Sequence, residues 1–147
     1  MVGDKLHDGP GLTIACVNSA GRLNDSQGNR LQPLTDLIKH HGVDMVSVSE
    51  TQLSWVKSEE TARGINMTEN TTVHATFNSP TAVALTNESN SKNQGTAAMS
   101  STRCHRSLVE SKKRCTGRII VNTYALDSGN HLVWMTIYAP PKPVAEP

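Results

Sequence analysis

Aromatic side chains are scarce in this chain of 147 residues, since Phe, Trp and Tyr together make up only 3% of it. A buried aromatic side chain usually removes about 150–250 Å² from water. The core must therefore depend on Val, Ile, Leu, Met and Ala. Hydrophobic residues make up 36% of the chain, so the sequence predicts a thin core.

Long hydrophobic runs and strong net charge are also missing. No apolar run approaches the roughly 20 residues that a membrane helix needs, and residues 1–10 lack the apolar centre of a secretory signal. A net charge of +1 argues against a globally basic nucleic-acid binder and a highly charged disordered chain. We expect one domain, in the cytoplasm or nucleus, with no membrane partner.

Cysteine is rare as well. Cys16, Cys104 and Cys115 are odd in number and widely spaced, which does not fit a disulfide framework. The Cys104-His105 pair with Cys115 lacks the paired spacing of zinc ligands. The sequence thus predicts neither a disulfide-stabilised fold nor a zinc module.

The first 50 residues have the pattern strand, helix, strand. Residues 12–18 are mostly apolar and β-branched, which predicts a buried strand, and residues 44–49 predict another. Apolar residues between them recur with helical spacing. Pro33 fits only the first turn of that helix, and Gly42 fits its left-handed C-terminal cap. Such a unit strongly prefers a right-handed crossover.

The rest of the chain predicts strands separated by turns. Of residues 64–102, many are Asn, Ser or Thr and few are charged. Residues 127–130 predict a hairpin turn. The predicted strands are residues 71–77, 81–86, 96–100, 117–124 and 131–138. We expect a flexible N-terminus over residues 1–11, a folded part over 12–140 and a proline-rich tail over 141–147.

Positive charge is concentrated between Arg103 and Arg118. This stretch holds one acidic residue, Glu110, whereas acidic residues outnumber basic ones in the remainder. Two interpretations are open: a stretch that contacts nucleic-acid phosphates, or a solvated loop. The candidate nucleic-acid-binding residues are Arg103, Arg106, Lys112, Lys113, Arg114 and Arg118.

Three fragments carry a resemblance to a known family. A strand ends at Asn18, a second ends in Ser49-Glu50-Thr51, and a third ends in Tyr138-Ala139-Pro140. In this order and context, the chain resembles the N-terminal half of the endonuclease/exonuclease/phosphatase superfamily over residues 12–140. It is most similar to the apurinic-type endonuclease domains of non-LTR retrotransposons. Ser49 departs from the family, which usually has Gln there, and Ala20 replaces a polar residue.

The resemblance implies a fold, a cofactor and three catalytic residues. The fold would be α/β in the α+β sense: the N-terminal half of a four-layer α/β/β/α sandwich with a mixed, mostly antiparallel sheet. The family hydrolyses phosphoesters with Mg²⁺ or Mn²⁺. Glu50 matches its metal-binding glutamate, Asn18 matches the asparagine that supports the metal or the phosphate, and Tyr138 matches a phosphate-contacting tyrosine. The metal would polarise the phosphoryl oxygen.

Two motifs of the family are missing from this sequence. It contains neither Asp-x-Asn nor Ser-Asp-His, which activate and hold the attacking water in the family. We therefore expect weak metal binding, poor catalysis and a C-terminal half-domain as a partner. A sheet without its partner would expose an apolar face and promote self-association. Three functions remain open: part of a nuclease or phosphatase, an inactive relic, and a nucleic-acid-binding module.

Overall fold

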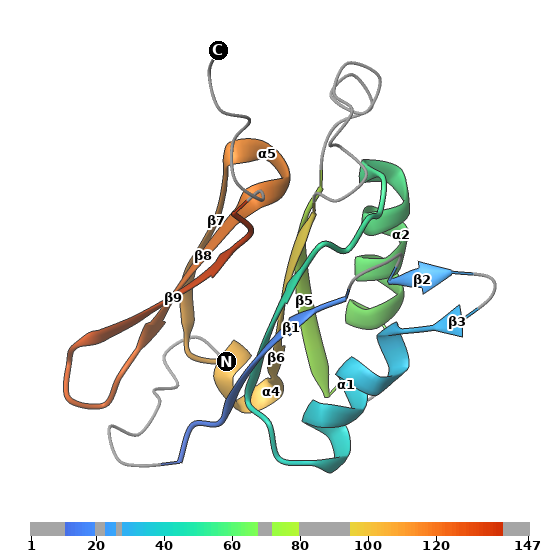
Figure 1. Ribbon diagram of the computed structural model, residues 1–147. Helices are drawn as coiled ribbons and strands as arrows, with labels where there is room; N and C mark the ends of the chain where they lie inside the picture. Colours follow the sequence, from blue (N-terminus) through green and yellow to red (C-terminus); the bar gives the residue numbers. More distant parts are fainter. Residues whose placement is uncertain (1–10, 20–22, 26–27, 68–71, 80–94, 140–147) are drawn as a thin grey trace.

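The computed structural model describes residues 11–19, 23–25, 28–67, 72–79 and 95–139 (Figure 1). These residues form an α+β fold with a mixed sheet, which confirms the predicted fold class. The predicted strand over residues 81–86, most of the N-terminal segment and the proline-rich tail lie outside the described residues.

A four-stranded mixed sheet has the order β1-β4-β6-β5. Its first two strands are parallel, with Asn18 aligned with Ser49, and the other pairs are antiparallel. Gly42 has φ +69°, as its predicted capping role requires. The predicted strand–helix–strand unit is thereby confirmed. Its elements and the other strands of the sheet are β1 (Ile14–Asn18), α1 (Leu31–His40), β4 (Met45–Ser49), β5 (Val73–Asn78) and β6 (Thr96–Ser101).

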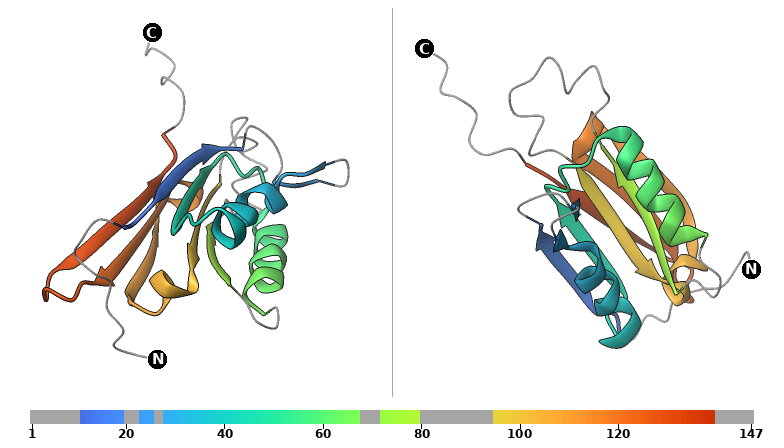
Figure 2. Two further views of the ribbon diagram at one scale, coloured as in Figure 1. Left: turned by 90° about the horizontal axis from the view of Figure 1, so that it is seen from below. Right: turned by 90° about the vertical axis from the view of Figure 1, so that its right-hand side faces the viewer.

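Two helices cover one face of this sheet (Figure 2). α1 buries Leu34 and Ile38 there. α2 (Trp55–Asn66) was not predicted, and its buried residues are polar, Ser58 and Thr61. The hydroxyl of Ser54 caps it by accepting a hydrogen bond from the backbone N–H of Lys57, at 3.2 Å. The short strands β2 (Asn24–Asp25) and β3 (Gly28–Asn29) form a separate ribbon.

A three-stranded antiparallel sheet, of order β7-β8-β9, packs on the other face of the mixed sheet. The hydroxyls of Ser47 on β4 and Thr136 on β9 are 2.8 Å apart across this interface. The predicted hairpin between β8 and β9 is confirmed. Its strands and the flanking short helices are α4 (Thr102–His105), β7 (Leu108–Arg114), α5 (Cys115–Arg118), β8 (Ile119–Ala125) and β9 (His131–Ile137).

The outer face of the three-stranded sheet is mostly apolar along β8 and β9, and it is charged along β7, where Lys112 and Arg114 are aligned with Val121 and Ile119. Val133, Met135 and Ile137 of β9 are 56%, 54% and 52% exposed. The described residues thus make three layers, which are helices, mixed sheet and three-stranded sheet (Figure 1). None of the described helices is long and apolar enough to cross a membrane.

Candidate functional site

The three residues singled out by the family resemblance come together at one end of the two sheets. Asn18 ends β1 and is aligned with Ser49, which ends β4, and Glu50 follows directly. Tyr138 follows β9, and its side chain is buried. Burial, and then the negative charge of Glu50, raise the pKa of Tyr138. The carboxylate and the phenol therefore interact electrostatically, although they come from different sheets.

The backbone of Glu50 has a left-handed conformation. Its φ is +55°, and that of Gln52 is +53°. Such values are uncommon outside glycine and persist only where neighbouring structure holds them. Ser19 supplies part of that support, since its hydroxyl donates to the carbonyl of Glu50 at 2.5 Å and its N–H donates to Ser49 at 3.0 Å. The end of β1 thereby fixes the turn that carries the carboxylate.

A chain of backbone hydrogen bonds joins this turn to the second sheet. Thr51 donates to the carbonyl of Gly95 at 3.2 Å, and Gly95 donates to that of Gly117 at 3.0 Å. Tyr138 donates to the carbonyl of the next residue, Arg118, at 2.7 Å. Gly95 has φ +114°, and a Cβ there would collide with Oγ1 of Thr51. The sequence predicted Gly117 at the start of a strand and Gly95 directly before one, but it did not connect either glycine with the site.

Arg118 is the predicted cation that lies beside this pair. Its positive charge opposes the other effects by lowering the pKa of Tyr138. It ends α5 and is partly buried. A cation next to a phenol and a carboxylate suits an anionic ligand such as a phosphate.

The other five predicted basic residues do not gather around the site. Arg103 pairs with Asp44 at 2.7 Å, near the beginning of β4. On β7, Lys112 pairs with Glu110 at 3.1 Å and Lys113 reaches Glu59 of α2 at 3.8 Å. Arg106 is exposed after α4, and Arg114 ends β7. The stretch is largely exposed, as the solvated-loop interpretation expects, but it is not a loop, because most of it is the edge strand β7 and two short helices.

Metal ligands at the site would come from oxygen donors. The candidates are the carboxylate of Glu50 and the amide oxygen of Asn18. Within the part of the chain that the structure describes, no group of three His, Cys, Asp or Glu residues is arranged to hold a metal ion. Mg²⁺ takes oxygen ligands, keeps several waters and is often held by one or two carboxylates together with substrate phosphates. The donors fit a weakly held hard cation.

A cleft of about 430 Å³ begins at the site and runs between β1, β4 and β9. Its described lining contains no charged side chain. Thr136 of β9 contacts Ser47 of β4 there, and Trp134 of β9 and Cys16 of β1 also line the cleft. The cleft is thus an uncharged groove that leads away from the charged residues of the site.

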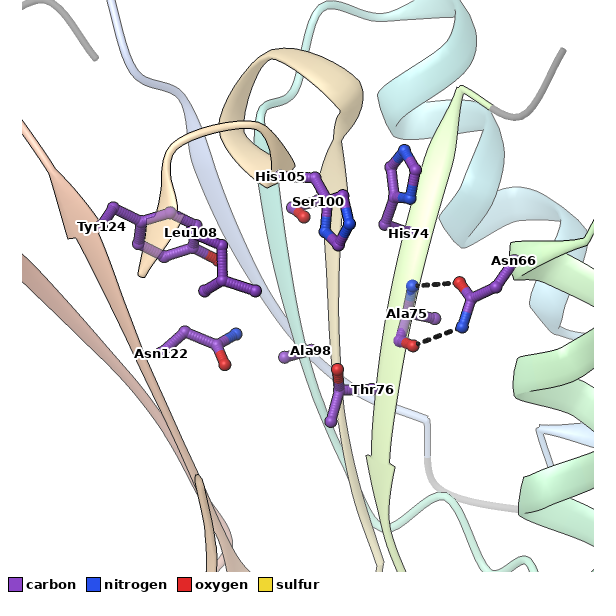
Figure 3. A pocket seen from close by; sticks show the side chains of 10 residues that line it. All are labelled: Asn66, His74, Ala75, Thr76, Ala98, Ser100, His105, Leu108, Asn122 and Tyr124. Carbon is purple, nitrogen blue, oxygen red and sulfur yellow. Dashed lines mark hydrogen bonds between the residues drawn. The ribbon is translucent and has the colours of Figure 1, made fainter. Parts of the chain in front are cut away.

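A second pocket, of about 400 Å³, was not predicted (Figure 3). His74 of β5 and His105 of α4 stack there with parallel rings, 3.9 Å between centroids. Thr102 Oγ1 lies 3.2 Å from Nε2 of His74. Burial lowers the pKa of both imidazoles. Because the two rings are stacked in parallel planes, the lone pairs of their nitrogens do not converge on a single metal position. The pair therefore does not form a chelating site.

Models of known protein families give no match to this chain, and neither do curated protein sequences.

Proposed function

We propose that this chain is one half of an endonuclease/exonuclease/phosphatase-type domain and carries half of a metal-dependent phosphoesterase centre. The observation that supports this most is the meeting of Asn18, Glu50 and Tyr138 at the ends of three strands from two sheets. The predicted fourth layer would then cover the exposed outer face of the three-stranded sheet.

Each residue has a distinct role in this proposal. Glu50 and Asn18 hold the cation, which when bound neutralises charge on the phosphoryl oxygens. Tyr138 is protonated at neutral pH, since the ordinary pKa of a phenol is 10 and burial raises that of Tyr138 further, so its hydroxyl donates a hydrogen bond to a phosphate oxygen. Arg118 attracts the phosphate by its charge.

The proposed half-site has no group assigned to activate the attacking water. General-base assistance typically contributes about 10²–10⁴-fold to a rate. We therefore expect this chain alone to bind metal and phosphate weakly and to show no Mg²⁺-dependent hydrolysis. A second polypeptide with Asp-x-Asn and Ser-Asp-His motifs would supply the activating groups.

A plasmid-nicking assay tests the proposal. The chain is assayed alone and with such a C-terminal half, with and without Mg²⁺. Nicking is expected only from the pair with Mg²⁺, and Glu50→Gln should abolish it, whereas Glu60→Gln, an exposed change on α2, should not. Nicking by the pair that survives Glu50→Gln would contradict the site. Strong nicking by the chain alone would contradict the proposal that it carries only half of the catalytic centre.

A nucleic-acid-binding module is the second candidate. Lys112 and Arg114 of β7 are exposed and aligned with Val121 and Ile119 of β8, on the outer face of the sheet. Each phosphate contact that is lost should reduce the salt dependence of binding by about 0.9 in log–log slope. Binding of a DNA duplex should therefore lose about 2 units of slope when both residues become Ala. An unchanged slope would show that this edge does not contact DNA.

A further inference from the structure

One face of β1 is left uncovered by the second sheet. Ala15 and Val17 pack toward the helix-side core, whereas Ile14 and Cys16 point to the opposite face. On that same face of the neighbouring β4, Met45 is fully buried and Ser47 touches Thr136. Ile14 is nevertheless 47% exposed, and Cys16 is exposed. The three-stranded sheet therefore ends over β4, one strand short of β1.

The strand at that end, β9, has an unpaired edge. Within the described residues it pairs with β8 alone. Tyr138 donates to Arg118 across this pair, and antiparallel bonding alternates along a strand. The backbone N–H and C=O groups of Val133, Met135 and Ile137 consequently point away from β8, toward the free edge. These groups are the template that a further strand requires.

The two edge strands of this sheet, β7 and β9, differ in how well they are protected against pairing with a further strand. Natural edge strands usually avoid pairing through charged side chains, proline or bulges. The opposite edge, β7, carries Glu110, Lys112 and Lys113, and its register shifts between Leu108 and Glu110. From Leu132 to Ile137, β9 has no charged residue, no proline and no register shift. The contrast indicates that the β9 edge is built to be paired.

The cleft beside β9 has room for one strand. Neighbouring strands lie about 4.8 Å apart, and β9 lies over β4. A strand added to β9 would therefore lie over β1, the neighbour of β4. It would cover Ile14 and Cys16, and it would extend the apolar interface in which Met45 and Trp134 are already buried.

A second copy of this chain does not fit the same place. Suppose that β9 paired with β9 of another copy about a two-fold axis. In each copy β4 lies beneath β9, so β4 of the second copy would have to lie where β1 of the first copy already is. An isolated extended segment has no such layer beneath it. The occupant is therefore a single strand rather than a whole sandwich.

We infer that the free edge of β9 and the adjoining cleft bind an extended, uncharged segment of another polypeptide by β-strand addition. The segment is about as long as β9. Its alternate side chains are aliphatic or small, because they pack on Ile14 and Cys16 in a groove whose described lining lacks charge. Backbone hydrogen bonds to β9 supply affinity, and the groove supplies selectivity. This inference does not depend on phosphoester chemistry.

Alkylation of the full chain by iodoacetamide tests this inference, because the cysteines provide a reporter and an internal control. Cys16 lines the cleft and is exposed, whereas Cys115 is exposed outside its lining. The probe is a synthetic peptide of alternating Val and Thr, as long as β9, with Lys at each end. We expect it to slow alkylation of Cys16 several-fold and to leave Cys115 unchanged. The same peptide N-methylated on alternate residues, which removes the donors that face β9, should protect neither cysteine.

Protein variants complete the test by fluorescence anisotropy of the labelled peptide. Met135→Pro removes an edge N–H without disturbing the β8 pairing, and Ile14→Arg places a charge in the groove; both should weaken binding. Val109→Arg on the opposite edge should not. Equal protection by the N-methylated peptide, equal protection of Cys115, or no protection of Cys16 would overturn the inference. Protection of Cys16 that grows with protein concentration, without peptide, would overturn it in favour of a second copy.

Discussion

The carboxylate of Glu50 acts on the phenol of Tyr138 across the junction of two sheets. Burial and this negative charge raise the pKa of Tyr138, and the positive charge of Arg118 opposes them. The three groups are thus coupled although no two of them share a strand or helix. The coupling provides a test of the site geometry that does not require activity.

Removing the charge of Glu50 should lower the pKa of Tyr138. We expect Glu50→Gln to shift the ultraviolet titration of the tyrosine to lower pH, whereas Arg118→Met should shift it to higher pH. Tyr124 is almost fully buried and its pKa is also raised, so it titrates separately and marks unfolding. Glu60→Gln is the matched control. An unchanged titration in Glu50→Gln would place the carboxylate away from the phenol.

Gly95 should resist substitution because it closes the turn behind Glu50. Gly95→Ala combines an unfavourable φ with a collision at Thr51, so we expect a loss of about 1–3 kcal/mol in the free energy of unfolding. Gly64→Ala is the control, since it lies in α2 with open space around it and should be neutral or stabilising by up to about 1 kcal/mol. Urea unfolding measures both.

A second substitution separates the collision from the backbone strain. Thr51 is fully buried, and its Oγ1 has no hydrogen-bond partner among the described residues. Thr51→Ala removes the atom that a Cβ at position 95 would meet, so it should recover part of the stability that Gly95→Ala loses. Equal losses in the single and the double variant would show that the backbone conformation alone is responsible.

Sequence patterns predicted the elements that bury apolar side chains periodically. β1, α1, β4, β6, β8 and β9 were predicted within a few residues of their bounds. α2 was missed because it buries Ser58 and Thr61 instead of an apolar stripe. β7 was missed because nearly all its side chains are exposed, which leaves no alternation to detect.

The candidate site was predictable only where it lies at strand ends. Asn18 ends β1 and Glu50 directly follows β4, its parallel partner, so local pattern and pairing bring them together. The link from Thr51 through Gly95 to Gly117 depends on how two sheets pack, which no local pattern specifies. The stacking of His74 on His105 likewise joins separate elements through tertiary packing.

The stacked histidines should make stability depend on pH. Burial, and then the charge of His105, lower the pKa of His74, and burial lowers that of His105. The unfolded chain therefore binds more protons than the folded one as pH falls below the ordinary value of 6.5. The melting temperature should therefore be independent of these two histidines above pH 6.5 and should decrease as the pH falls below that value. His105→Gln should reduce this pH dependence. If the melting temperature changes with pH equally in the wild-type and the variant proteins, the coupling between the two histidines is contradicted.

The exposed outer face of the three-stranded sheet should cause self-association. The exposed side chains of Val133, Met135 and Ile137 are aligned with Thr123, Val121 and Ile119 of β8. β8 and β9 together therefore form a mostly apolar surface on the outer face of the sheet. Such surfaces gain roughly 25 cal/mol per Å² when they leave water. Sedimentation velocity of the wild-type chain should therefore show association that grows with concentration.

Changing the three exposed β9 residues to Thr should reduce this association, because Thr retains β-propensity and is less apolar. Val56→Thr on α2, equally exposed, is the control and should leave association unchanged. Association that persists in the triple variant would assign it to another surface of the chain.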